Sequence, residues 1–543
     1  MLVHLSHYLH NNHVPSEDEE HEIKALKVKP LREISAIDVE IKRIEGILHS
    51  LKQKRADLQQ SMDDCNTILA PVRRLPMDVL SIIFTYSLAT HRNPIMSPSE
   101  APILLTHICH DWRSISLSIP RLWCRLHIPL LLKTSEQYFS HIAPHRQDAE
   151  RREARSEEVQ RWLTLSASRP LSIMITSTGS VSSYHRPPMD AILRSSRRWQ
   201  ELELGYIAPQ SNLSQKMLDF TTYDLCLLQE LRVHSIPNPQ DTWLESCLFN
   251  APGLRSISIA TMPETTSYMP VNWKNLNRLF IHSPIMLELV TQILNHCRNL
   301  VACLLEVQEP AWGWNPELAP ELSSFLPHLK FLSLRGDSTA CNHLYSNIRA
   351  PSLRVFRGTF AWLGLFNLLR SIHSLETLMM DHPPVSDDVF EFYTLIPSLT
   401  RLFLGQPSQP LTERDKPSWV TDLYTIRHPS TPDSAPTVLL PSLEVFEAFG
   451  IKWMTDEHFL KFIINRIYVA KSNTSVSKLR RVFVQFSRLR QMDIVPEALA
   501  YAREAGIELE LDLKYCSDAL GNVWSPSFGL VDDVSWAYPS YDD

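Results

Sequence analysis

The segment LPHLKFLSL, Leu326–Leu334, contains the pattern that decides the fold of most of the chain. Apolar residues occupy the first, fourth and sixth places of LKFLSL, and a proline stands two residues before Leu329. A proline followed by alternating apolar residues is typical of a bend that leads into a β-strand. We therefore expect a strand here, with Leu329, Leu332 and Leu334 buried in the core.

The same six-residue pattern occurs eleven times from Trp199 onward. Most successive copies lie 22 to 29 residues apart, and runs such as IMLELVTQILNHC and AWLGLFNLLRSI between them have helical patterning. A strand followed by a helix at this period predicts an α/β fold, with a parallel sheet inside and helices outside. The alternative is an array of leucine-rich helices. The copies begin at Trp199, Leu228, Leu254, Leu276, Leu300, Leu329, Leu353, Leu375, Leu399, Leu443 and Leu479.

This arrangement resembles the leucine-rich-repeat family in a degenerate form. The resemblance implies an irregular solenoid over residues 161–513, interrupted by a loop at 405–440 that is rich in Pro, Ser and Thr. The family has an asparagine after each strand, but this chain has residues such as Met262, Asp337 and Pro383 in those places. The resemblance therefore does not determine the conformation of the turn after each strand or the curvature of the solenoid.

Alternation along the strands predicts which side chains point away from the core. The third and fifth places of the pattern hold aromatic rings next to arginines, which is typical of a protein-binding surface. The alternative is that the acidic, aromatic tail at 514–543 covers this surface, and we hypothesise that residues 523–543 compete there with a protein target. The candidate target-binding residues are Arg278, Phe280, Phe331, Arg357, Arg401, Phe403, Arg481 and Phe483.

A long amphipathic helix is predicted near the N-terminus, over residues 31–68. Apolar residues from Ile34 to Cys65 recur at alternating spacings of three and four, and Arg55 is the one charged residue in this series. Such a heptad pattern predicts either a homodimeric coiled coil through residues 34–65 or a helix that packs on its own chain. Residues 1–30 show no periodicity and are predicted to form a disordered tail.

Two apolar segments follow this helix, ILAPVRRLPMDVLSIIFTYSL at 68–88 and ICHDWRSISLSIPRLWCRL at 108–126. Leu75-Pro76 is placed to begin one helix, and Ile119-Pro120 is placed to end another. A small helical unit cannot bury this much apolar surface by itself, and exposed apolar patches mark partner sites. The alternative is a three-helix packing motif without a partner.

The order of these residues resembles the F-box family, in the form found in mushroom-forming fungi. The resemblance covers residues 71–128 and rests on LPMDVLSIIF, CHDWR and PRLW, with Asp78 where the family more often has Glu. It implies an F-box-like helical domain that docks on a Skp-type adaptor and through it on a cullin, with a charged linker at 129–160 before the repeats. The implied adaptor-binding residues are Leu75, Pro76, Val79, Leu80, Ile83, Phe84, Cys109, Trp112, Leu122 and Trp123.

Composition excludes several other functions. The net charge is −7 without a basic cluster, which disfavours nucleic acid, and no apolar window is long enough for a membrane span. Nine cysteines without a CxxC motif indicate a reducing compartment, cytoplasmic or nuclear. No nucleophile elbow, phosphate loop or metal motif is present, so we expect no enzyme, cofactor or metal. Cys297 and Cys303, the nearest approach to a cluster, are expected to be core residues.

The sequence therefore favours a substrate-receptor subunit of a Skp-cullin-F-box ubiquitin ligase, which binds an unidentified protein target through its repeats. The alternative is a scaffold protein that uses the repeats and the coiled coil without a ligase.

Overall fold

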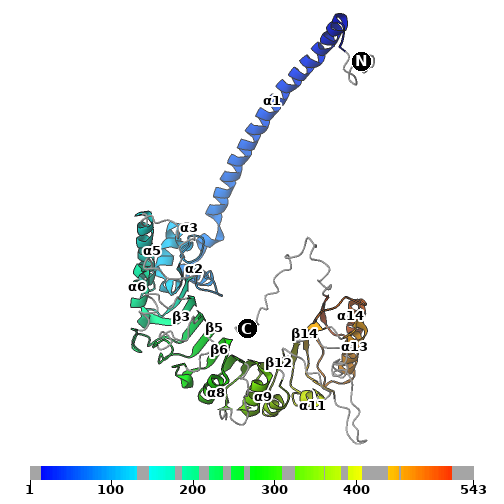
Figure 1. Cartoon of the computed structure of the whole chain (residues 1–543). Helices are drawn as coiled ribbons and strands as arrows, with labels where there is room; N and C mark the ends of the chain where they lie inside the picture. Colours follow the sequence, from blue (N-terminus) through cyan, green and yellow to red (C-terminus); the bar gives the residue numbers. More distant parts are fainter. Residues whose placement is uncertain are drawn as a thin grey trace. The chain divides into compact units, whose positions relative to one another are not determined.

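The computed structural model describes residues 14–130, 146–177, 186–206, 219–235, 246–261, 269–308, 324–359, 361–380, 389–405, 438–451 and 454–515 (Figure 1). The chain divides into two compact units, Met1–Ile83 and Phe84–Asp543. No helix within the described ranges is both long enough and apolar enough to cross a membrane. The predicted loop at 405–440 and the predicted tail at 514–543 lie almost wholly outside the described residues.

The first unit is dominated by one helix, α1 (Glu17–Leu69), followed by the short 3-10 helix η2 (Pro71–Arg74) and the start of α2 (Met77–Tyr86). The prediction of a tail up to residue 30 is wrong from Glu17 onward, and residues 1–13 lie outside the described residues. The helix begins early because Ser16 and Glu19 form a reciprocal capping box. Four acidic residues in the first turn also favour a helix N-terminus there.

The second unit contains a sheet of fourteen strands whose spatial order follows their order in the chain. Every neighbouring pair is parallel. The strands are β1 (Arg125–Leu130), β2 (Leu171–Ser177), β3 (Trp199–Tyr206), β4 (Glu230–Ser235), β5 (Ser256–Thr261), β6 (Arg278–Ile285), β7 (Ala302–Val307), β9 (Phe331–Gly336), β11 (Val355–Gly358), β12 (Thr377–Met380), β13 (Arg401–Leu404), β14 (Val445–Ile451), β15 (Arg481–Phe486) and β16 (Glu510–Tyr515). A separate pair joins β8 (Ser324–Phe325) to β10 (Ile348–Arg349).

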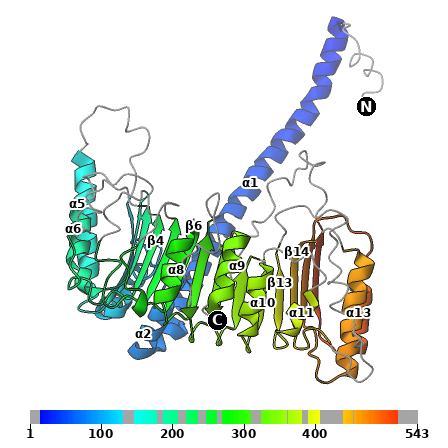
Figure 2. The same ribbon diagram turned by 60° about the horizontal axis from the view of Figure 1, so that its bottom comes forward.

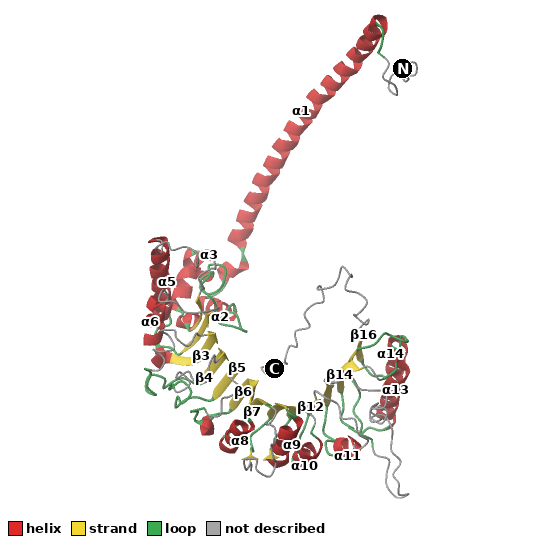
Figure 3. Ribbon diagram, in the orientation of Figure 1, coloured by secondary structure: helices red, strands yellow, loops and turns green. Residues whose placement is uncertain are grey.

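Helices cover one side of this sheet, and the strands follow an arc with the helices on its outer side (Figures 2 and 3). The expected mixed α/β architecture is therefore confirmed. Its parallel strands lie inside and its helices outside, which is compatible with a solenoid-like arrangement. We call the side of the sheet that faces away from these helices the inner face. The helices are α5 (Arg146–Leu165), α6 (Arg186–Arg194), α8 (Leu287–His296), α9 (Ser338–Asn347), α10 (Trp362–Arg370), α11 (Val389–Thr394), α13 (Asp456–Ser472) and α14 (Val495–Glu504).

The six-residue pattern predicts the register of the sheet well. In every copy except the first, the strand begins at the third residue of the pattern, as Phe331 does in LKFLSL. The fourth and sixth residues then point under the helices, and Leu329, Leu332 and Leu334 are fully buried as predicted. Gly336 ends β9 at a φ of +121°, where a Cβ would overlap the carbonyl oxygen of Val307, so only glycine fits this turn.

The second unit starts with a helical segment made of α3 (Leu105–Ile108), α4 (His110–Ser118) and the 3-10 helix η3 (Pro120–Trp123). The predicted end of the helical domain at residue 128 is wrong, because β1 already belongs to the sheet. The predicted charged linker at 129–160 is also wrong in part, because α5 packs on the unit. Its residues Val159, Trp162 and Leu163 are buried and lie at helical spacing, so the charged run has one apolar face.

Candidate functional site

The first candidate surface is the exposed side of α2. Leu80 is buried, and so is Phe84 four residues later, so these two residues mark the buried side of the helix. Met77, Ile82 and Ile83 are 64%, 57% and 43% exposed. Three of the predicted adaptor-binding residues in this segment are accessible, namely Pro76, Val79 and Ile83, and Leu75 is half-buried. Leu80 is buried, which excludes a direct contact of its side chain with a partner.

The predicted adaptor-binding residues of the second unit mostly hold that unit together. The ring of Phe84 packs on Trp112 with 4.7 Å between centroids, and Trp112 stays half-buried. Trp123 lies edge-on to Trp162 of α5 at 4.9 Å. Because Phe84, Leu122 and Trp123 are buried, their predicted contact with an adaptor is wrong. The side chains of the PxLW segment pack inside the protein instead.

Cys109 is exposed, but its role is local. Its Sγ accepts a hydrogen bond from the backbone N–H of Trp112 at 3.5 Å and so caps the N-terminus of α4. A cysteine at this place in the motif therefore has a structural explanation that needs no partner.

The second candidate surface lies on the inner face, at the carboxy-terminal end of the sheet. The rings of Phe403, Phe449 and Phe483 stand on the neighbouring strands β13, β14 and β15. The centroid of Phe449 is 5.0 Å from that of Phe403 and 5.1 Å from that of Phe483. We call these three half-buried rings the aromatic row. The ammonium group of Lys514, on β16, lies 5.2 Å from the centroid of Phe483, within cation–π range.

Phe449 and Lys514 were not predicted. The copy LEVFEA ends at Ala448, so Phe449 falls one residue beyond the pattern although alternation places it on the same face as Glu447. Lys514 is on β16, a strand to which the pattern does not extend. The alternation of LELDLKY is the signal that would have revealed this strand.

Arginines border the aromatic row. Arg401 is exposed at the start of β13, two residues before Phe403. Arg481 is exposed at the start of β15, where its guanidinium lies 3.8 Å from the carboxylate of Glu447 and 3.9 Å from that of Glu510. Arg357 on β11 is half-buried. The row is therefore an apolar strip with mixed charge around it.

The structure does not bring all the predicted target-binding residues together. Arg278 lies over the ring of Phe280 at 6.0 Å on β6, and four strands separate β6 from β13, the nearest strand of the aromatic row. Phe331 is only 6% exposed, so its predicted role at the surface is wrong. It lies in register with Ala302 and Val355 in the middle of the arc, where inward curvature crowds the side chains of neighbouring strands.

The amino-terminal part of the inner face is polar and paired within itself. Ser172 donates to Glu201 at 2.7 Å, Arg232 donates to Glu230 at 2.6 Å, and a ring nitrogen of His234 lies 2.7 Å from Glu203. These groups already satisfy one another, so an added ligand would have to displace existing hydrogen bonds. The aromatic row is therefore the better candidate for binding.

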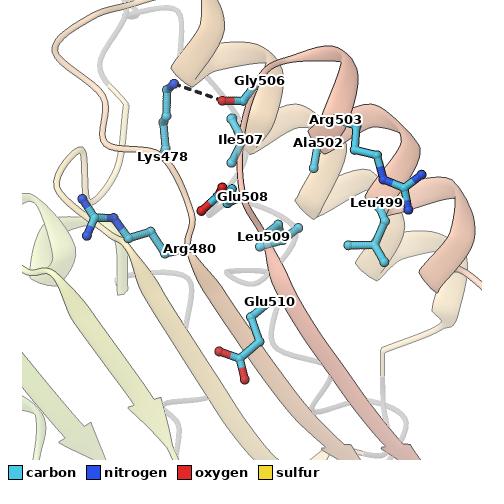
Figure 4. Close-up of a pocket in the computed structure, with 10 residues that line it drawn as sticks. All are labelled: Lys478, Arg480, Leu499, Ala502, Arg503, Gly506, Ile507, Glu508, Leu509 and Glu510. Atoms are coloured by element: carbon cyan, nitrogen blue, oxygen red, sulfur yellow. Dashed lines mark hydrogen bonds between the residues drawn. The ribbon is translucent and has the colours of Figure 1, made fainter.

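A surface cleft of about 870 Å³ opens beside α14, at the start of β15 and β16 (Figure 4). The ammonium of Lys478 donates to the carbonyl of Gly506 at 3.4 Å, and the guanidinium of Arg480 lies 3.4 Å from Glu444. Its lining contains no histidine, cysteine, serine or threonine. Two of the lining cations are therefore engaged in structural contacts, and the lining holds no hydroxyl, thiol or imidazole group.

The cysteine cluster noted in the sequence belongs to the core. Cys297 and Cys303 are fully buried, and burial raises the pKa of the Cys303 thiol to about 12. A thiol in this environment is unreactive. Within the described residues, no group of three His, Cys, Asp or Glu side chains is placed to hold a metal ion.

No protein-family model matches the chain, and comparison with curated proteins gives no match either.

Proposed function

We propose that the chain is an F-box substrate receptor of a Skp-cullin-F-box type ubiquitin ligase. The observation that carries the proposal is the exposed apolar side of α2, with Met77, Ile82 and Ile83 in water. Burying apolar surface contributes about 25 cal/mol of favourable free energy per Å², so an interface that covers this side of the helix would be strongly favoured. The resemblance of LPMDVLSIIF to the F-box pattern favours a Skp-type adaptor as the partner for this helix.

The target would bind on the inner face of the sheet. The strand-and-helix units of the second unit support the interpretation as degenerate leucine-rich repeats, whose inner faces are binding surfaces. The aromatic row supplies three adjacent rings, and Lys514 and Arg401 supply positive charge at its border. Aromatic and arginine side chains are the residues that contribute most to protein interfaces. The favoured ligand is a peptide with aromatic and acidic residues.

The receptor would perform no chemistry itself. It would hold the target near the ubiquitin-charged enzyme of the ligase and so raise the effective concentration of the target lysines. No catalytic group on this chain is required for that mechanism.

The exposed position of Ile83 provides the test of adaptor binding. Changing Ile83→Asp places a charge in the middle of the proposed interface, so the affinity for a purified Skp-type adaptor of a mushroom-forming fungus should fall at least about hundredfold. The dissociation constant can be measured by isothermal titration calorimetry with the full chain.

Leu363→Asp is the matched control, because Leu363 is 61% exposed on α10 and receives the same change. This variant should bind the adaptor like the wild type. The assignment of α2 as the adaptor-binding helix is wrong if the Ile83→Asp variant, with unchanged circular dichroism, binds the adaptor as the wild type does. It is also wrong if the wild type does not bind the adaptor.

The aromatic row provides a test of the tail hypothesis, which concerns residues outside the described ranges. A chain that ends at residue 522 should show more fluorescence of a hydrophobic dye than the full chain. The peptide VWSPSFGLVDDVSWAYPSYDD, added separately, should bind the shortened chain and reverse the increase. Phe449→Ala should weaken peptide binding about tenfold, because it removes the central ring of the row.

Leu363→Ala in the same shortened chain is the control and should leave peptide binding unchanged. Equal peptide affinity in the Phe449→Ala variant and its parent would show that the tail does not occupy the aromatic row. Adaptor binding would be unaffected by that outcome, so the two surfaces are tested separately.

A further inference from the structure

The helix α1 has an apolar seam that nothing within the described residues covers. No residue of this helix is buried, and the apolar side chains of the seam are between 46% and 63% exposed. A single helix gains little stability in water without packing along an apolar face. The seam consists of Ile34, Ile37, Ile41, Ile44, Leu48, Leu51, Leu58 and Met62.

We propose that a second copy of the chain covers this seam as an antiparallel coiled coil, with Ile34 of one copy opposite Cys65 of the other. The spacing of three and four continues without interruption from Ile34 to Cys65, which is about 4.5 heptads. That length suffices for a stable pair of helices, whereas a globular surface would not require so regular a seam. This inference does not depend on the proposed ligase function.

The charges beside the seam decide the orientation. In a parallel pair, Glu40 would face Glu45 of the second copy, and the two Arg55 side chains would meet in the core, so both contacts would be repulsive. In the antiparallel register, Glu45 faces Lys52 of the second copy, and this attractive pair occurs twice by symmetry.

The same register also improves the position of the other charges. Glu40, which already accepts two hydrogen bonds from Arg43 in its own helix, faces the neutral Ser61 of the second copy and no longer meets Glu45. Arg55 meets Ile44 and lies beside Glu45 of the second copy, so its charge is compensated at the edge of the core. The antiparallel register thus removes both repulsive contacts and adds the Glu45–Lys52 pair twice.

A thiol cross-link tests the register. Cys65 is a free, exposed cysteine. In the full chain with Ile34→Cys, oxidation by diamide should link the introduced thiol to Cys65 of the second copy, and peptide mass spectrometry identifies that link. The same chain with Cys65→Ala should not form it. A parallel dimer would instead link the two Cys65 residues in the wild type, and a monomer would form neither link. Either of these results overturns the proposal.

A charge reversal gives an independent test, because it should change the strength of self-association in opposite directions for the antiparallel and the parallel pair. Glu45→Lys should weaken self-association about tenfold in the antiparallel pair, because two attractive contacts become repulsive. The double variant Glu45→Lys with Lys52→Glu should restore it. In a parallel pair Glu45→Lys would strengthen association, since it removes the repulsion from Glu40. Analytical ultracentrifugation measures the dissociation constants, and unchanged helix content by circular dichroism shows that each variant is folded.

Discussion

Replacing Asp456 by asparagine is expected to lower the local free energy of unfolding of the carboxy-terminal end of the sheet by about 3 to 5 kcal/mol. The carboxylate is 1% exposed at the start of α13. One of its oxygens accepts from the guanidinium of Arg488 at 2.5 Å and from the hydroxyl of Tyr515 at 3.1 Å. The other accepts from the backbone N–H groups of Gln491 and Met492 at 2.7 and 2.8 Å.

The effect should be large because one carboxylate joins three parts of the fold. It connects α13 to the segment after β15 and to the end of β16. Removing its charge leaves the largely buried side chain of Arg488, which is 13% exposed, without this carboxylate as its counterion. Breaking one partner of a buried ion pair costs several kcal/mol, more than the intact pair contributes to stability.

The pH dependence follows from the same contacts. Burial alone would raise the pKa of Asp456, but hydrogen bonds from Arg488, Met492 and Gln491 lower it below its ordinary value. A lowered pKa in the folded state stabilises the fold at pH values above the unfolded value of about 3.9, and this contribution is lost as the pH falls through the folded value. The difference between wild type and Asp456→Asn should therefore be constant above about pH 5 and shrink in more acid solution.

Hydrogen exchange of residues 454–515 measures this local stability directly, since a long repeat array need not unfold in one step. Glu457→Gln is the matched control, because Glu457 is the next residue in the same helical turn and is exposed. It should leave the exchange rates near those of the wild type. Equal protection in Asp456→Asn and Glu457→Gln would show that the buried carboxylate does not hold these elements together.

The second large effect is expected for Leu332→Ala, which should cost about 2 to 5 kcal/mol. Leu332 is fully buried on β9 and lies in register with Cys303 and Phe356 on the two neighbouring strands. Shortening this side chain removes apolar contacts and leaves a cavity that the fixed strands on both sides cannot close. Urea unfolding followed by circular dichroism, together with hydrogen exchange of β9, measures the loss.

Leu363→Ala controls for the chemical change itself, because Leu363 is 61% exposed on the outer helix α10. That variant should differ from the wild type by a few tenths of a kcal/mol. A similarly small change for Leu332→Ala would mean that the register of β9 is shifted by one residue, since such a shift moves Leu332 to the inner face.

The sequence predicts the strands of the sheet because each copy of the pattern specifies its own register. A bend, a buried leucine and alternation of period two are local signals, and Leu332 and Leu334 are buried as they require. The strands β1, β2 and β16 lie outside the repeated copies and were missed. The long helix α1 was recognised by its heptads, but its start was not, because the capping residues Ser16 and Glu19 precede the apolar period.

The candidate sites were predicted less well because burial is decided by tertiary packing. In α2 several faces are apolar, and nothing local indicates that Leu80 and Phe84 turn inward while Ile82 and Ile83 remain exposed. The burial of Phe331 depends on the crowding of strands in the middle of the arc. Similarly, the aromatic row arises from the register between β13, β14 and β15, which single copies of the pattern do not specify.

The agreement between chain order and strand order has a consequence for how this protein folds during synthesis. Within the fourteen-stranded sheet, each strand after β1 pairs with the strand that precedes it directly in the order of the sheet. When a new strand leaves the ribosome, its partner is therefore already present, and the sheet can grow at one edge, one unit at a time. Until the next strand arrives, the growing edge exposes unpaired backbone groups, which makes it the point at which a nascent chain is most open to mispairing.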